Sequence, residues 1–310
     1  MTRVAVTLGD PRGIGPEVTA AALARPWDAE FTVIGAAEQV EVLPAAARVA
    51  VGRWQGRAGE AGGHRDALAA GRVAGLAIEA AARLALAGEV DAIVTAPAHK
   101  HALHLAGFRY PGHTEWLAEL AGGCEVAMML ASDRLRVVLA TTHVALRDVP
   151  ALLTRERLVA TGRTTLAGLR DWFGIAEPRL ALCALNPHAG EGGLFGDEEA
   201  RVLEPAARAL GASGVFPADT VFVRALRGDF DAVLAPYHDV GMTAIKVASF
   251  GRAVNVTLGL PFPRTSPDHG TALDIAGRGV ADAASMVEAV GLAVRLGARA
   301  QAARRASSPR

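Results

Sequence analysis

Short apolar segments alternate with longer helix-like segments along most of this chain, and this alternation limits the possible folds more than any other feature. The helix-like segments include an alanine-rich stretch at 66–87. The apolar runs read RVAVTLG, FTVIGA, DAIVTAP, LRVVLATTH, RLALCALNPH, DAVLAPYH and AVNVTLGL. Strands that alternate with helices form layered α/β domains around a largely parallel sheet. We therefore expect the α/β class, with further helices near 154–173, 197–210 and 282–304.

Length, charge and cysteine content exclude several classes of protein. The chain has 310 residues, about half of them hydrophobic, which is enough for two domains with buried cores. Its formal net charge is zero, so the usual electrostatic argument for a nucleic-acid or acidic-membrane partner is absent. No apolar run is long enough to span a bilayer, and the first residues lack a secretory-signal pattern. Two cysteines make no disulfide framework. We expect a cytoplasmic protein that binds neither nucleic acid nor membrane.

Three histidines stand directly after apolar strand-like runs. ATTH ends at His143, CALNPH at His188 and LAPYH at His238. In open α/β sheets ligands bind beyond the carboxyl ends of the strands, so these side chains can converge from distant parts of the chain. Three neutral imidazoles suit Zn²⁺, Co²⁺ or another divalent metal and leave a coordination position open. Each histidine alone is equally compatible with a hydrogen-bonded loop residue, and it is the repeated context that favours a shared site.

Two further segments carry groups suited to anions. In YPGHTEWLAEL, His113 and Thr114 stand where a helix begins, a position that favours a bound anion. Lys246, Asn255 and Arg264 supply two cations and an amide within a short span, and apolar residues flank the first two. Only two of the 32 basic residues are lysines. We therefore expect Lys246 to bind phosphate or carboxylate and, if burial lowers its pKa, to move a proton.

The glycine-rich segment LGDPRGIGPE does not match a nucleotide-binding motif. Its glycines do not follow the order G-x-G-x-x-G, and no P-loop lysine follows them. Taken alone, this segment is a turn at the start of a helix.

Taken together, the motifs resemble the family of 4-hydroxythreonine-4-phosphate dehydrogenases, enzymes of pyridoxal phosphate biosynthesis. The resemblance covers nearly the whole chain. The matching segments are TLGDPRGIGPEV, TAPAHK, GHTEWLA, TTHVALRDVP, LNPHAGEGGLFGDEE, GVFPADTVF, YHDVG and GRAVNVTLGLPFPRTSPDHGTALDIAG. It implies two α/β/α domains with a cleft between them, similar to isocitrate and isopropylmalate dehydrogenases. The first domain is expected at 1–122 plus 247–310, and the second, with the metal ligands and dimer contacts, at 123–246.

The resemblance also assigns roles to individual residues. The expected ligands of one divalent metal (Zn, Co or Mg) are His143, His188 and His238, which with Lys246 make up the expected catalytic set. The expected substrate contacts are His113, Thr114, Lys246, Asn255 and Arg264. HGTALDIAG is similar to a dinucleotide-binding stretch, which makes His269, Gly270 and Asp274 candidates for binding NAD or NADP. Where the family usually has glutamine in YHDVG, this chain has Val240.

The implied reaction is an oxidation coupled to loss of CO₂. The enzyme would oxidise 4-phosphohydroxy-L-threonine to the 3-oxo acid, which decarboxylates to 3-amino-2-oxopropyl phosphate. A homodimer with the site at its interface is implied as well.

Three alternatives remain open from the sequence. The nearest is a dehydrogenase of four-carbon sugar-acid phosphates, such as threonate or erythronate 4-phosphate, whose motifs look the same. A metal-dependent phosphatase or hydrolase would use the histidines differently, although such sites usually add a cluster of carboxylates. A non-catalytic two-domain binding protein is the third.

Overall fold

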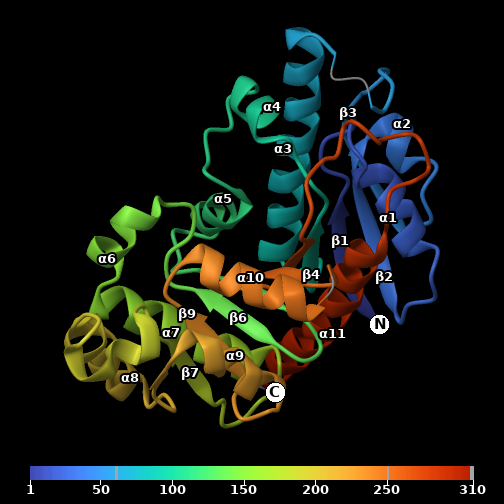
Figure 1. The fold of residues 1–310 in the computed structure, drawn as a ribbon. Helices are drawn as coiled ribbons and strands as arrows, with labels where there is room; N and C mark the ends of the chain where they lie inside the picture. The colour runs from blue at the N-terminus through green and yellow to red at the C-terminus, as the bar shows by residue number, and fades with distance from the viewer. Residues whose placement is uncertain (60–61, 250, 308–310) are drawn as a thin grey trace. The chain divides into compact units, whose positions relative to one another are not determined.

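The computed structural model describes residues 1–59, 62–249 and 251–307, and contacts within the chain divide it into two units (Figure 1). Unit 1 comprises Met1–Cys124 and Leu260–Arg310, and unit 2 comprises Glu125–Gly259. Each unit has a sheet covered by helices, so the α/β class expected from the sequence is confirmed. The division differs from the expected border at 246, because the helix that contains Lys246 continues to Ser249 and the strand after it pairs within unit 2.

Unit 1 is built on a fully parallel sheet with the strand order β3-β2-β1-β4-β11. Its strands are β1 (Thr2–Thr7), β2 (Ala29–Ala36), β3 (Ala47–Gly52), β4 (Ala92–Thr95) and β11 (Arg264–Pro267). The central strands β1 and β4 are buried on both faces, which explains their continuous apolar sequences. Because the strands are parallel, Thr7 and Thr95 end β1 and β4 at the same edge.

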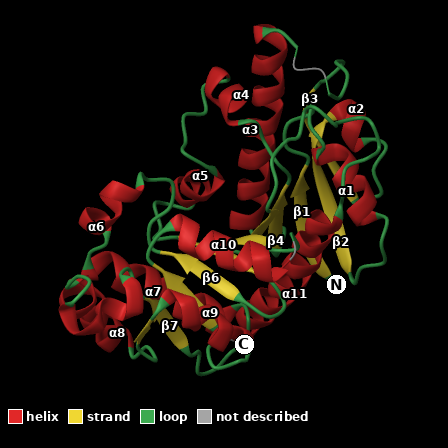
Figure 2. Cartoon of the chain, viewed as in Figure 1, coloured by secondary structure: helices red, strands yellow, loops and turns green. Residues whose placement is uncertain are grey.

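Helices cover both faces of the unit 1 sheet (Figure 2). The helices of unit 1 are α1 (Gly15–Leu23), α2 (Ala37–Val40), α3 (His64–Leu86), α4 (Lys100–Leu105), α5 (His113–Leu120) and α11 (Ala284–Ser307), of which α4 and α5 contact α3. Right-handed crossovers place α1 and α3 on opposite faces, since the chain moves outward from β1 to β3 and then returns to β4. The helix α11 contacts α1, β1, β4 and β11. The last helix of the chain thus completes the core that the first strand begins.

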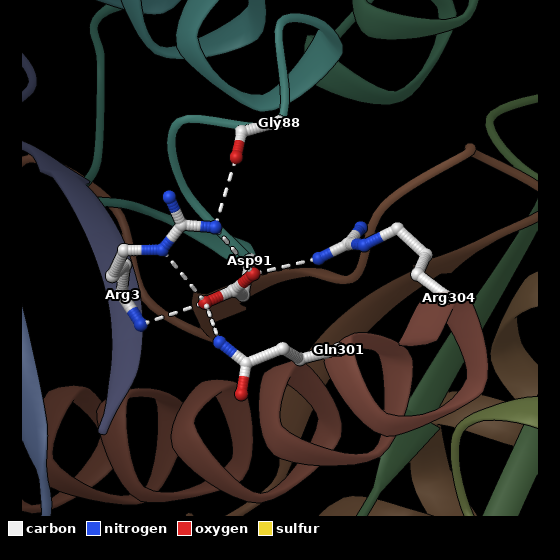
Figure 3. A network of polar contacts seen from close by, with 5 residues as sticks. All are labelled: Arg3, Gly88, Asp91, Gln301 and Arg304. Atoms are coloured by element: carbon white, nitrogen blue, oxygen red, sulfur yellow. Dashed lines mark hydrogen bonds and ion pairs between the residues drawn. The ribbon is translucent and has the colours of Figure 1, made fainter. Parts of the chain in front are cut away.

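A buried carboxylate ties the two parts of unit 1 together (Figure 3). The Asp91 side chain is fully buried and accepts hydrogen bonds from Arg3, from Gln301 (3.1 Å) and from Arg304 (2.7 Å). Burial alone would raise the pKa of Asp91, but the hydrogen bonds and charge of Arg3, with the charge of Arg304, outweigh it and lower that pKa. The start of β1, the start of β4 and the end of α11 are therefore joined at one ionised group.

Unit 2 has a mixed sheet with the strand order β10-β5-β6-β9-β7-β8. Its strands are β5 (Ala127–Ala131), β6 (Arg136–Leu139), β7 (Leu180–Cys183), β8 (Val215–Phe216), β9 (Ala232–Ala235) and β10 (Val254–Leu258). The strands β6, β9, β7 and β8 run parallel, whereas β5 is antiparallel to both of its neighbours. These four parallel strands bring their carboxyl ends to one edge of this sheet.

The helices of unit 2 connect these strands. They are η1 (Leu146–Asp148), α6 (Val149–Leu152), α7 (Arg155–Asp171), η2 (Pro187–Gly193), η3 (Glu199–Leu203), α8 (Glu204–Leu210), α9 (Ala218–Leu226) and α10 (His238–Ser249). Side chains of α9 and α10 share one hydrophobic core with β5, β6, β7 and β9. No helix in the described part of the chain is long and apolar enough to cross a membrane.

The sequence did not predict every element. The strands β3, β5, β8 and β11 were not expected from the sequence. Lys246 lies on a helix although apolar residues flank it, because Met242, Ile245 and Ser249 follow helical spacing and face the core. Lys246 itself is exposed.

Candidate functional site

The three histidines singled out from the sequence stand at one edge of the unit 2 sheet. His143 follows β6, His188 follows β7, and His238 begins α10 directly after β9. These strands are adjacent and parallel, in the order β6-β9-β7. The shared edge is therefore a direct result of parallel pairing, as the sequence predicted.

The structure brings His143 and His238 together. Their ring centroids lie 5.5 Å apart, close enough for two imidazoles to share one ion. The Nδ1 atom of His238 lies 2.7 Å from Oδ1 of Asp239. Because an ionised carboxylate only accepts hydrogen bonds, it favours the tautomer with the proton on Nδ1 and the lone pair on Nε2. A carboxylate behind an imidazole in this way is the usual support of a histidine metal ligand.

His188 does not join that pair. Its ring contacts that of Phe195, with ring centroids 6.2 Å apart. Across residues 1–59, 62–249 and 251–307, no group of three or more His, Cys, Asp or Glu side chains is arranged to hold a metal ion. The strand order explains part of the separation between His143 and His188, because β9 lies between β6 and β7, the strands that they follow.

A left-handed turn carries His188. The five residues from His188 to Gly192 all have positive φ, between 42° and 77°. Three of them, His188, Ala189 and Glu191, are not glycine, and a left-handed conformation costs roughly 1 kcal/mol or more for each such residue. The surrounding structure must therefore hold this turn in place.

The donors present fit a divalent metal, but they are incomplete in one chain. His143 and His238 provide two borderline nitrogen ligands at adjacent strand ends, and Asp239 supports one of them. Four large apolar side chains that follow His143 or His188 within seven residues are exposed: Val144, Leu146, Leu194 and Phe195. Where exposed apolar side chains form one patch, they mark an interaction surface.

The remaining unit 2 candidates are Lys246 and Asn255. Lys246 is exposed on α10, so unit 2 alone does not provide the burial that a proton-transfer role would need. Asn255 lies on β10, and its Oδ1 is buried without a hydrogen-bond partner among the described residues. A buried acceptor without a donor is costly, which marks Asn255 as a site for a further donor. Val240 packs against the hydrophobic core of unit 2.

In unit 1 the most constrained candidate is Arg264, the first residue of β11. Its side chain is only 4% exposed, and its Nε and Nη2 donate to Oγ1 of Thr95 at 3.1 and 2.6 Å. Burial lowers the pKa of Arg264 to about 10, a shift that nearby Glu115 opposes. The guanidinium therefore stays charged at neutral pH and has a fixed orientation at the end of the sheet. Thr95 had not been singled out from the sequence.

His113 adds a neutral group next to this cation. Burial lowers the pKa of His113 to about 3, helped by the charges of Arg264 and Lys100. The residue as a whole is half-buried, but its Nε2 is shielded from solvent and has no hydrogen-bond partner in the described part of the chain. Thr114 follows in the first turn of α5. A shielded imidazole, a buried guanidinium and a helix N-terminus together suit an anionic ligand.

Aromatic stacking fixes the helix that carries His113. Trp116 is 1% exposed and stacks on Tyr110 and Phe108, with ring centroids 4.9 and 4.8 Å away. These contacts set the position of the first turn of α5.

The expected cofactor residues lie in the loop that follows β11. His269 has a shielded Nε2 with no partner among the described residues, and an added Cβ at Gly270 would meet no atom within 4 Å. Asp274 is exposed. A shielded ring nitrogen beside an open glycine backbone is compatible with a polar ligand such as a dinucleotide.

The segment LGDPRGIGPE supports this loop. Arg12 forms a buried ion pair with Asp10, with 2.8 Å between Nη2 and Oδ2. The Ile14 amide donates to the carbonyl of Thr271 at 3.0 Å. The segment is thus more than the simple turn that its glycines indicated, since it is hydrogen-bonded to the 269–277 loop.

Comparisons with known proteins agree on one family, although the relatives are named for two substrates. The model of the pyridoxal phosphate biosynthetic protein PdxA family matches residues 6–293. A 4-hydroxythreonine-4-phosphate dehydrogenase of Beijerinckia indica is 46% identical over 94% of each chain. A D-threonate 4-phosphate dehydrogenase of Salmonella typhimurium is 43% identical over 94% of this chain and 98% of its own. Among solved structures, a 4-hydroxythreonine-4-phosphate dehydrogenase from Klebsiella pneumoniae has a TM-score of 0.84 and 39% identity, covering 96% of this chain and all of its own.

Proposed function

The chain belongs to the PdxA family of pyridoxal phosphate biosynthetic proteins, and on that premise we propose that it oxidises 4-phosphohydroxy-L-threonine with a nicotinamide cofactor and one divalent metal. It is an oxidoreductase by the agreement of its relatives. The observation that carries the proposed site is the approach of His143 and His238 to 5.5 Å between ring centroids at adjacent parallel strand ends.

Unit 1 supplies the groups that bind the acidic parts of the substrate. Arg264 offers a fixed positive charge, and its hydrogen bonds to Thr95 set the orientation of its guanidinium group. His113 is neutral near pH 7 and contributes a hydrogen bond from a shielded nitrogen. With Thr114 at the start of α5, these residues suit a phosphate or carboxylate.

Unit 2 supplies the proposed metal ligands His143, His188 and His238. A divalent metal held there would polarise the substrate hydroxyl and ease the loss of its proton. Asp239 orients His238 by holding its Nδ1 proton. Lys246 and Asn255 complete the proposed contacts of this unit, with Lys246 as the candidate for moving a proton.

The redox step needs NAD or NADP. A nicotinamide bound to the chain would supply the hydride acceptor for the carbon that bears the hydroxyl, whose oxygen would lose its proton. We assign the cofactor contacts to His269, Gly270 and Asp274 after β11. The resulting 3-oxo acid then loses CO₂, which leaves 3-amino-2-oxopropyl phosphate.

An assay of NADH formation tests this function. Purified protein is incubated with 4-phosphohydroxy-L-threonine and NAD, before and after removal of metal by a chelator. We expect absorbance of NADH to rise, to stop after chelation and to return when Zn²⁺, Co²⁺ or Mg²⁺ is added. Release of inorganic phosphate without NADH would instead support a metal-dependent hydrolase.

A second substrate has specific support. A relative named D-threonate 4-phosphate dehydrogenase is 43% identical, close to the value for relatives named after the amino acid substrate. Both substrates carry the same phosphate and a secondary hydroxyl, so the groups in unit 1 do not discriminate between them. Parallel assays with D-threonate 4-phosphate and 4-phosphohydroxy-L-threonine decide between the two substrates, since the preferred one has the higher kcat/KM.

We further propose that a second copy of this chain completes the site. The metal ligands are incomplete within one described chain, and the exposed Leu194 and Phe195 stand next to the His188 turn. Light scattering at micromolar concentration should give the mass of a dimer. The cytoplasmic location remains a prediction from the sequence.

A further inference from the structure

The left-handed turn that carries His188 is closed at its base by one buried carboxylate. Glu199 is 3% exposed. Its Oε1 accepts hydrogen bonds from the backbone amides of Leu185 (2.9 Å) and Asn186 (2.8 Å). Its Oε2 accepts one from Nδ2 of Asn186 at 2.9 Å. The residues that enter the turn are therefore held by a residue that follows it.

The exit of the turn is held at the same place. Nδ2 of Asn186 also donates to Oε2 of Glu198 at 2.7 Å. Glu199 is the first residue of η3, a short π-helical turn, and π-helical turns are frequent at functional sites. Entry and exit of the loop 187–197 are thus joined by two neighbouring carboxylates.

The turn leaves no space for a larger side chain at Gly190, which lies close to Glu199. Gly190 is buried, and a Cβ there would lie 3.0 Å from Oε2 of Glu199 and 3.1 Å from the carbonyl of Gly196. The amide of Phe195 donates back to the carbonyl of Gly190 at 3.2 Å. The carboxylate therefore contacts both the base and the middle of the turn.

We propose that Glu199 is a positioning residue for His188. By tying Leu185 and Asn186 to the exit of the loop, it holds His188 and Ala189 in a conformation that these residues would not adopt in an open chain. The imidazole then stands at a fixed place beside the strand end. The inference rests on the proposed role of His188 as a metal ligand, and it adds a residue that acts through that ligand.

Metal binding to the metal-free protein tests the proposal without any turnover. The protein is titrated with Co²⁺ alone, and affinity is followed by calorimetry and by the visible absorption of bound cobalt. We expect Glu199→Gln to weaken Co²⁺ binding by roughly tenfold or more, as is usual when the support of a ligand is removed. In Glu204→Gln, which loses an exposed carboxylate paired with Arg208 on α8, the affinity should not change.

A double-mutant cycle separates positioning from general loosening. His188→Ala keeps His143 and His238, so its weakened Co²⁺ affinity is measured at millimolar Co²⁺. Because Glu199 acts through His188, Glu199→Gln should cause no further loss of that residual affinity. Equal losses in both backgrounds, or no loss in either, would overturn the proposal. Should Glu199→Gln fail to fold, Glu199→Asp shortens the side chain by one methylene and serves in the same cycle.

Hydrogen exchange gives an independent measure. Amides in 184–197 should exchange faster in Glu199→Gln than in wild type, and those of α8 should not. If wild type oxidises its substrate but Glu199→Gln keeps full Co²⁺ affinity, only the positioning role fails. If wild type fails to oxidise either substrate, the proposed function fails while the cobalt cycle still decides the role of Glu199.

Discussion

Unit 1 and unit 2 hold their candidate functional groups in different ways. In unit 1, Arg264 starts a strand, is almost fully buried and is bonded through two nitrogens to Thr95 at the end of the neighbouring strand. In unit 2, His188 sits on a turn of positive φ, and only two of three histidines lie together. Regular structure thus fixes the proposed anion-binding groups, whereas side-chain hydrogen bonds maintain the turn behind one proposed metal ligand. The proposed anion-binding groups are ordered within one chain, whereas only two of the three proposed metal ligands come together there.

The largest effect is expected at the less regular region. His188→Ala should remove bound metal and lower turnover together, by roughly a thousandfold, because polarisation of the substrate oxygen contributes several kcal/mol. Metal content by mass spectrometry and NADH formation measure the two losses. His64→Ala, which changes an exposed histidine at the start of α3, is the control. Retained metal with lost turnover would make His188 a base and not a ligand.

The next effect concerns Lys246. Lys246→Arg keeps the positive charge but replaces a compact ammonium by a planar group with a much higher pKa. If Lys246 moves a proton, kcat should fall by about a hundredfold while KM changes little. Full turnover in this variant would leave Lys246 as a simple binding charge.

Acid stability sharpens the comparison for unit 1. The pKa of His113 is about 3 in the folded protein and near 6.5 when unfolded. Below pH 6.5 the unfolded chain therefore binds a proton that the folded chain does not, so stability is complete above pH 6.5 and is lost as pH falls towards 3. Between pH 7 and pH 5, urea unfolding should show wild type losing up to about 2 kcal/mol more than His113→Asn. Equal losses would mean that solvent reaches this imidazole.

The smallest effect is expected at Thr95. Thr95→Val keeps the shape but removes the hydroxyl that accepts two hydrogen bonds from Arg264. Since hydrogen bonds to charged groups contribute about 1.5 kcal/mol or more, KM for the phosphorylated substrate should rise about tenfold with little change in kcat. Thr95→Ser keeps the hydroxyl and should behave as wild type. A fall in kcat alone would show that Thr95 does not act through substrate binding.

The sequence predicted the location of the histidines better than their arrangement. Apolar runs ending in His143, His188 and His238 predict three strand ends at one edge, because parallel strands share their carboxyl ends. It did not predict which two would meet. That depends on the spatial order β6-β9-β7 and on a left-handed turn, and neither leaves a periodic signal.

The supporting residues were missed for a different reason. Thr95 and Glu199 lie within the quoted segments TAPAHK and LNPHAGEGGLFGDEE, but nothing there marks them as supporting residues. Thr95 contacts Arg264, 169 residues away, and Glu199 contacts Asn186 across the turn, 13 residues away. Apolar residues flank Lys246, and only the helical spacing of Met242, Ile245 and Ser249 shows which side of this segment faces the core. Local patterns identify elements, whereas these contacts depend on how the elements fold against one another.

The hydrogen bonds that Arg3, Gln301 and Arg304 donate to Asp91 affect how the protein folds while it is synthesised on the ribosome. Unit 2 is one continuous stretch, Glu125–Gly259, so its whole chain has emerged while the end of unit 1 is still being synthesised. Arg3 and Asp91 are both available early in translation, whereas Gln301 and Arg304 become available only after the α11 helix has left the exit tunnel. Because domains fold as units during synthesis, the domain that starts first is the one that finishes last.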